Sequence, residues 1–110
     1  MGYIVLAPYR VKKENQSAFF EVVKEKRKYF TEKGFMTARV PIFLQSRKDE
    51  EVFIDIFEWT SEEHIDKAHE DEGVRKLWTK MAELWVNGGF KLNTLQESKM
   101  NFPNFIPVDL

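Results

Sequence analysis

An acidic residue stands in the middle of an apolar segment of the sequence, FIDIFEWT at residues 53–60. Aromatic and β-branched residues dominate this segment, and that composition predicts a β-strand. Asp is depleted in strands and is rarely buried unless a partner neutralises it. Asp55 is therefore either exposed or buried beside a cation, and a buried carboxylate in an apolar setting is a candidate for acid–base chemistry.

Two histidines are the other candidates for proton transfer, because an imidazole titrates near neutral pH. His64 and His69 are five residues apart, about 140° around a helix, so they do not form the i, i+4 pair that binds a metal on one helix. A surface or capping role remains open for each of them. The sequence contains no Cys, and it has no glycine-rich phosphate loop, Ser-His-Asp order or zinc-ligand spacing.

Composition narrows the functional classes. The chain has 110 residues, which predicts one domain, and its 43% hydrophobic and 15% aromatic content argues against disorder. The formal net charge of −1 provides no field that would attract a nucleic acid. Ile4–Ala7 is too short for the apolar core of a signal peptide, and no segment approaches a membrane span. We therefore expect a cytoplasmic protein without nucleic-acid or membrane partners.

Hydrophobic periodicity predicts the elements that position these residues. The expected strands are residues 3–11, 35–45, 52–59 and 90–96; the expected helices are residues 15–33, stopped by Gly34, and a segment that Thr60 or Ser61 caps, Gly73 divides and Asn87-Gly88-Gly89 ends. The order βαββαβ predicts an α+β, ferredoxin-like fold, with an antiparallel four-stranded sheet and its helices on one face. We expect this domain to span residues 1–97 and to be followed by an irregular C-terminal tail, residues 98–110.

Alternation along the two central strands separates the faces of the sheet. The even-numbered residues form a purely aliphatic or Met-containing row, which we expect beneath the helices: Met36, Ala38, Val40, Ile42, Leu44, Val52, Ile54 and Ile56. The odd-numbered row is aromatic and includes Asp55. A short turn near Lys48 predicts that Asp55 lies opposite Pro41, with Arg39 diagonally adjacent as its ion-pair partner. An aromatic face of this kind needs a cover, either a second sheet in a homodimer or a ligand.

The segment EWTSEEHIDKAHEDEGVRKLW, residues 58–78, resembles the antibiotic biosynthesis monooxygenase family, and the likeness extends over about residues 3–97. The resemblance implies a dimeric α/β barrel, in which two sheets meet in a homodimer and a small-molecule pocket lies inside the barrel or between each sheet and its helices. It also implies a reaction known among relatives, the oxidation of polycyclic aromatic compounds by O₂ without a metal or flavin.

The resemblance also suggests site residues. Trp59, His64, His69, Arg75 and Tyr9 lie in segments comparable to those that hold catalytic side chains in relatives. We expect His64, His69 and, from its place in the strand, Asp55 to be catalytic; the residues expected to contact the substrate are Arg39, Trp59, Tyr9, Phe57 and Trp78. Haem-degrading relatives use an Asn, a Trp and a His at positions that here hold Tyr9, Ala68 and Trp78, so the haem set is missing. We therefore expect no haem, flavin or metal cofactor. Core packing remains an alternative for Trp78, and a place in the dimer core for Trp59.

Three functions compete. The first is a cofactor-independent monooxygenase-like protein that acts on or binds a small hydrophobic aromatic compound. The second is a non-catalytic homodimeric module that binds a small molecule in the same pocket. The third is a single-stranded RNA binder, because RNA-recognition domains share the βαββαβ order and Phe53 and Phe57 could stack on bases. The absence of a Lys/Arg-Gly-Phe pattern and the charge of Asp55 argue against RNA.

Overall fold

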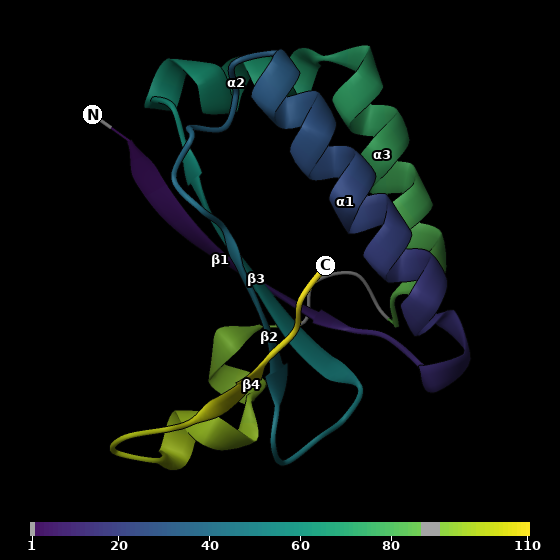
Figure 1. The fold of residues 1–110 in the computed structure, drawn as a ribbon, viewed down its shortest axis with the longest axis vertical. Coiled ribbons are helices and arrows are strands. Elements are labelled where there is room, and N and C mark those ends of the chain that lie inside the picture. Colours follow the sequence, from purple (N-terminus) through teal and green to yellow (C-terminus); the bar gives the residue numbers. More distant parts are fainter. Residues whose placement is uncertain (1, 87–90) are drawn as a thin grey trace.

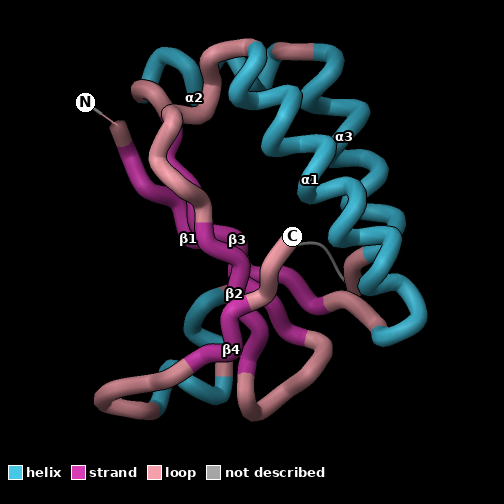
Figure 2. Tube along the Cα trace, in the orientation of Figure 1, coloured by secondary structure: helices cyan, strands magenta, loops and turns pink. Residues whose placement is uncertain are grey.

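The computed structural model describes residues 2–86 and 91–110 of the chain. It confirms the expected α+β, ferredoxin-like fold: a four-stranded antiparallel sheet carries three α-helices on one face (Figure 1). Figure 2 shows the same layers by element type, with the short 3₁₀ helices of residues 91–100 on the side of the sheet away from α1 and α3. None of the helices in the described part of the chain is long and apolar enough to cross a membrane.

Helix α1, Gln16–Glu32, follows a short 3₁₀ helix η1, Lys13–Asn15. Its buried residues recur at intervals of three and four along the sequence, and they are Phe19, Val23, Lys26 and Phe30. This spacing places them on one face of a helix, which packs on the sheet. The helix stops where the sequence predicted, because Gly34 adopts a φ of 77° that favours glycine.

Helices α2, Glu62–Glu70, and α3, Glu72–Leu84, form the expected divided helical segment. The Ser61 side chain caps α2 by accepting a hydrogen bond from the His64 N–H, and Asp71 caps α3 by accepting one from Val74. The division falls at Asp71, two residues before the glycine that predicted it. Gly73 instead allows α3 to approach α1 closely, since a Cβ at this position would collide with the Tyr29 hydroxyl of α1.

The sheet contains β1, Tyr3–Arg10; β2, Ile42–Ser46; β3, Val52–Trp59; and β4, Phe105–Pro107, in the order β1-β3-β2-β4. The second strand is shorter than predicted, because the chain from Thr37 to Pro41 does not pair regularly and only Met36 forms an isolated bridge, with Trp59. Pro41 cannot donate to a ladder, which is consistent with a strand that begins after it.

The prediction of a fourth strand at residues 90–96 is wrong for the residues that the structure describes. Leu92–Thr94 and Gln96–Lys99 form the 3₁₀ helices η2 and η3, while Phe90 and the predicted helix break at residues 87–89 lie outside the described residues. The observed fourth strand lies in the segment 98–110, which we expected to be irregular, and it pairs with β2. Short-range bonds such as Thr94 Oγ1 to the Lys91 carbonyl hold the 3₁₀ turns instead.

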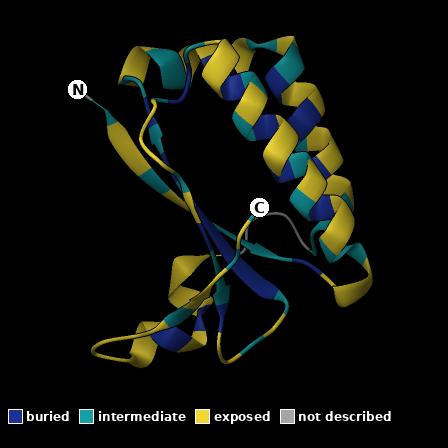
Figure 3. Cartoon of the chain, in the orientation of Figure 1, coloured by how far each residue is buried: buried dark blue, intermediate teal, exposed yellow. Residues whose placement is uncertain are grey.

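The assignment of the two sheet faces is also reversed. The odd-numbered residues of β2 and β3, together with Tyr9 of β1, pack against the helices and form the inner face; the even-numbered residues form the outer face, where Val52 and Ile54 contact Leu95. The register keeps the two rows separate as expected, but Asp55 lies opposite Phe43, not Pro41. Figure 3 shows the buried side of the helices turned toward the sheet. The aromatic row fills the space under the helices because α1 supplies a cation for its one carboxylate.

Candidate functional site

Asp55 is fully buried on the inner face, where two cations of α1 bind it. Lys26 Nζ lies 2.6 Å from Asp55 Oδ2, and Arg27 Nη2 lies 2.8 Å from Oδ1. The predicted partner was wrong: Arg39 is 63% exposed, and its Nε lies 3.1 Å from Oε1 of Glu58. Hydrogen bonds from Thr37 and then from Arg39 lower the pKa of Glu58. Arg39 faces away from Asp55 because the chain before β2 leaves the regular ladder.

Lys26 is the residue that the sequence reasoning missed. Its side chain is 1% exposed, and its ammonium lies 4.3 Å from the centre of the Phe57 ring and 5.6 Å from that of Phe30. An ammonium over aromatic faces is stabilised by the negative π-surface, in addition to its bond with Asp55. The signal was present in the sequence, since Lys26 falls at helical spacing between Val23 and Phe30 on the apolar face of α1.

A cavity of about 430 Å³ lies between the inner face of the sheet and the helices, and we call it the inner cavity. Side chains from β1, β3 and all three α-helices line it, together with the residue that ends α3: Val5, Ala7, Tyr9, Lys26, Phe57, Trp59, Ile65, His69, Trp78 and Trp85. Five of the eight predicted site residues are in this set. Arg39 and His64 are not among its lining residues, and Asp55 is connected to it through Lys26.

Tyr9 supplies a free hydroxyl to the inner cavity. Its ring stacks on Trp85, with centroids 5.3 Å apart, and meets the edge of Phe19. No residue in the described part of the chain forms a hydrogen bond with its hydroxyl. Burial, and then the negative charge of Asp55, raise the pKa of Tyr9. The phenol therefore remains protonated at neutral pH and can donate a hydrogen bond to a ligand.

The two histidines have different environments. His69 lines the inner cavity from α2, its ring centroid 5.1 Å from that of Trp78, and its Nδ1 lies 2.8 Å from the Ile65 carbonyl oxygen. A carbonyl only accepts, so Nδ1 must carry the proton and Nε2 has a lone pair that can take one. His64 Nδ1 lies 2.7 Å from Ser61 Oγ, within the cap of α2. His64 therefore lies in the N-terminal cap of α2, a position that the sequence left open as an alternative to a catalytic role.

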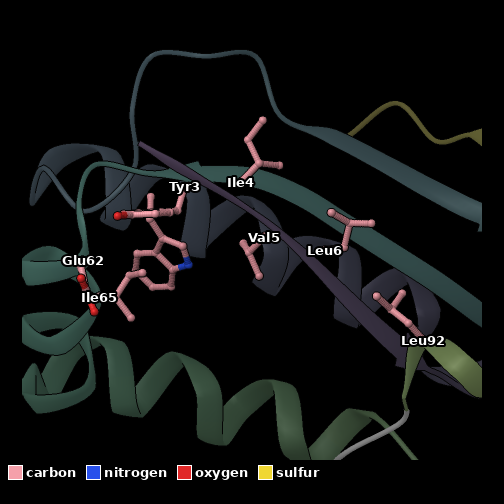
Figure 4. A pocket seen from close by; sticks show the side chains of 8 residues that line it. Tyr3, Ile4, Val5, Leu6, Glu62, Ile65 and Leu92 are labelled. Carbon is pink, nitrogen blue, oxygen red and sulfur yellow. The ribbon is translucent and has the colours of Figure 1, made fainter. Parts of the chain in front are cut away.

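A second, more open hollow of about 560 Å³ runs along β1, and we call it the edge groove. Figure 4 shows it extending from Tyr3 and Glu62 at one end to Leu92 at the other. It shares Val5, Trp59 and Ile65 with the inner cavity. Because the two hollows have these lining residues in common, they lie next to each other.

The structure also bears on two other functions, RNA binding and metal binding. Phe53 and Phe57, the rings that could have stacked on RNA bases, are 1% and 5% exposed beneath the helices, so they are not available on the surface. Within residues 2–86 and 91–110, no group of three or more His, Cys, Asp or Glu side chains is arranged to hold a metal ion. The polar groups of the inner cavity are thus Lys26, Tyr9, His69 and the indole nitrogens.

Solved structures with the same fold include proteins from three organisms. A conserved protein from Methanosarcina mazei aligns with a TM-score of 0.67 and 16% identity, over 79% of this chain and 84% of that one. A Bacteroides thetaiotaomicron protein, described as a possible oxidoreductase, aligns with a TM-score of 0.65 and 15% identity, over 77% and 88%. A proposed antibiotic biosynthesis monooxygenase from Nitrosomonas europaea gives 0.63 and 17%, over 78% and 81%. At these identities the likeness concerns the fold.

Sequence comparison adds the family. No curated protein matches the chain. The family model described as antibiotic biosynthesis monooxygenase matches residues 2–80, which include β1, α1, the β2–β3 hairpin, α2 and most of α3. All residues that line the inner cavity except Trp85 fall within this match. By this match the chain belongs to the antibiotic biosynthesis monooxygenase family.

Proposed function

We propose that the inner cavity binds a small hydrophobic aromatic compound and that the protein oxidises it with O₂, without a metal or flavin. The observation that carries this proposal is a partly open cavity walled by Tyr9, Phe57, Trp59 and Trp78, with a buried ammonium at one point of its wall. Ligand sites combine an apolar lining with a few placed polar groups in this way. Membership of the monooxygenase family supports the reaction class.

The electron balance limits the substrate. Without an external reductant, the substrate must supply all four electrons that reduce O₂. Conversion of a ring CH₂ to C=O meets this condition, because one oxygen atom enters the product and the other leaves as water together with the two hydrogens. The CH₂ group must be acidic enough to lose a proton before it reacts, which requires a base near the cavity.

In this proposal each polar side chain of the cavity has a different role. His69 is the base, because its Nε2 has no hydrogen-bond partner among the described residues and its ring lines the inner cavity. Asp55 holds Lys26 in place, since its two oxygens accept charge-assisted hydrogen bonds from Lys26 and Arg27, which protonation of the carboxylate would weaken. The indoles of Trp59 and Trp78 form the walls against which the rings of the substrate pack.

A binding module without catalysis is the second candidate. The observation in its favour is that His69 is exposed and is the single imidazole among the described lining residues of the inner cavity. Anthrone, a tricyclic ketone with an acidic CH₂, distinguishes the two: we expect binding by calorimetry and O₂ uptake at an electrode above the uncatalysed rate. His69→Gln should retain binding and lose most of the uptake. Binding with no O₂ uptake by the wild type identifies the binding module. An absence of binding would contradict both candidate functions.

The outer face of the sheet supports the homodimer, with a different surface from the one that the sequence suggested. Leu6, Ile56 and Ile42 lie in register across β1, β3 and β2, and Leu6 and Ile42 are 46% and 50% exposed. Ile4 extends the same patch. A second copy that packs its own outer face on this row would bury an apolar surface that is otherwise in water.

A further inference from the structure

The buried charges beside the inner cavity do not cancel. Asp55 accepts from Lys26 Nζ at 2.6 Å and from Arg27 Nη2 at 2.8 Å, so one carboxylate is shared by two cations and the group has a net charge of +1. An uncompensated charge in an apolar interior is unfavourable. The environment therefore favours the arrival of one further anion.

The two cations lie on different sides of Asp55. Arg27 is 17% exposed and borders a separate surface hollow, which also contains Pro41 and the exposed Asp109. Lys26 is 1% exposed and belongs to the wall of the inner cavity. Solvent and Asp109 can screen the charge of Arg27, whereas Lys26 belongs to the wall of the inner cavity, where a ligand could approach its ammonium.

The unused polar atoms of the cavity wall are mainly donors. An ammonium has three N–H groups, and among the described residues only Asp55 accepts a hydrogen bond from Lys26. The Tyr9 hydroxyl is a second donor, with no partner in the described part of the chain. Both oxygens of the adjacent carboxylate are occupied. A ligand that matches these donors must carry a strong hydrogen-bond acceptor, and an anionic oxygen is the strongest available.

We propose that the inner cavity selects aromatic compounds that carry one negative charge, as a carboxylate, phenolate or enolate, and that Lys26 and Tyr9 bind the charged oxygen. This inference rests on the proposed function and adds to it the charge of the ligand and the residue that recognises it. Arg27 remains bound to Asp55 when Lys26 turns to the ligand, so the buried carboxylate is never left without a cation. Phe57 and Trp78 pack against the apolar part of the ligand.

A pair of probes with nearly the same shape tests the charge requirement. 2-Naphthoate is an anion at pH 7.5, and 2-naphthamide is its neutral analogue. By calorimetry we expect the wild type to bind the naphthoate at least about tenfold more tightly. Lys26→Met retains an unbranched side chain without the ammonium, and it should reduce the preference to within about twofold. Lys24→Met is the matched control, because it removes the same charge from an exposed position of α1.

Each outcome separates this inference from the proposed function. Equal affinities in the wild type would show that the cavity binds aromatic compounds without selecting charge, and only the inference would be wrong. A preference that survives in Lys26→Met, or disappears in Lys24→Met, would remove the role of Lys26. If neither probe binds, the inference and the aromatic site are both wrong. The wild-type comparison holds even if Lys26→Met fails to fold, which circular dichroism would show.

Discussion

The inner and outer faces of the sheet are both apolar, yet they differ in almost every other property. Strand β3 contributes to both: Phe53 and Phe57 point to the helices, and Ile54 and Ile56 point away from them. The inner face is aromatic, contains a buried carboxylate with two cations and borders a partly open cavity of about 430 Å³. The outer face is mainly aliphatic, and the segment after residue 90 covers only part of it, through Leu95 and Phe105 and through Glu97, whose buried carboxylate accepts a hydrogen bond from Ser46.

This difference teaches that the presence of a charge does not identify the solvent side of a sheet. A carboxylate can be buried on the helix-covered face because helices supply cations on flexible side chains, and Lys26 does so here. Part of the aliphatic row remains in contact with water instead, since Leu6 and Ile42 are about half exposed. The helix-covered face is suited to a ligand, and the exposed face to a second protein surface.

The largest expected effect comes from Asp55→Asn, which leaves Lys26 and Arg27 without an anion. We expect the free energy of unfolding, measured in urea, to fall by ~3–5 kcal/mol. Asp55→Leu combined with Lys26→Met should recover most of this loss, because the surroundings are already apolar. Glu63→Gln is the control, since it removes the exposed partner of Lys67 and should cost less than ~1 kcal/mol. Asp55→Asn with unchanged stability would contradict the burial of the carboxylate.

The next effect concerns the outer face. Light scattering should show a dimer of the wild type at micromolar concentration, and Leu6→Glu should raise its dissociation constant at least about hundredfold, or ~2.7 kcal/mol. The physical reason is a charge placed in the centre of the aliphatic row beside Ile56. Ala18→Glu, on an exposed position of α1, is the matched control. A wild type that is monomeric at this concentration would argue against the homodimer.

A smaller effect is expected where the C-terminal segment covers the outer face. Leu95 is 7% exposed and packs on Val52 and Ile54. Leu95→Ala should lower the free energy of unfolding by about 2 kcal/mol, the low end for a buried leucine, because the site lies at an edge where neighbours can relax. Binding of the aromatic probe should be unchanged. Weaker binding with normal stability would show that the two faces are coupled.

The smallest effect is the contribution of Tyr9 to stability at alkaline pH. Burial raises its pKa in the folded protein above the ordinary value of 10.0. Its contribution to stability is therefore complete below that pH and is lost as the pH rises toward the folded pKa, because the unfolded state ionises first. Tyr9→Phe should therefore reduce the fall in stability between pH 9 and 11, in urea titrations at each pH. An unchanged pH profile would place the phenol in contact with water.

The sequence predicted much of this site without its geometry. Tyr9, Phe57, Trp59, His69 and Trp78 were selected from residue type and family resemblance, and they line one cavity. Their roles remain predictions. The pairing of Asp55 with Arg39 was wrong because it assumed that a charged partner lies on a neighbouring strand, whereas the observed partners come from the helix packed above. Lys26 could have been found, since it interrupts the apolar stripe of α1.

The sequence by itself determined the order of the elements before residue 86, the glycine that ends α1 and the separation of odd and even rows in the β2–β3 hairpin. These features depend on local periodicity, capping and backbone conformation, which are encoded over a few residues. Only the tertiary structure decided which row faces the helices and where the fourth strand pairs. Both rows are apolar enough to be buried, so the choice depends on side chains far apart in sequence, above all the meeting of Lys26 with Asp55.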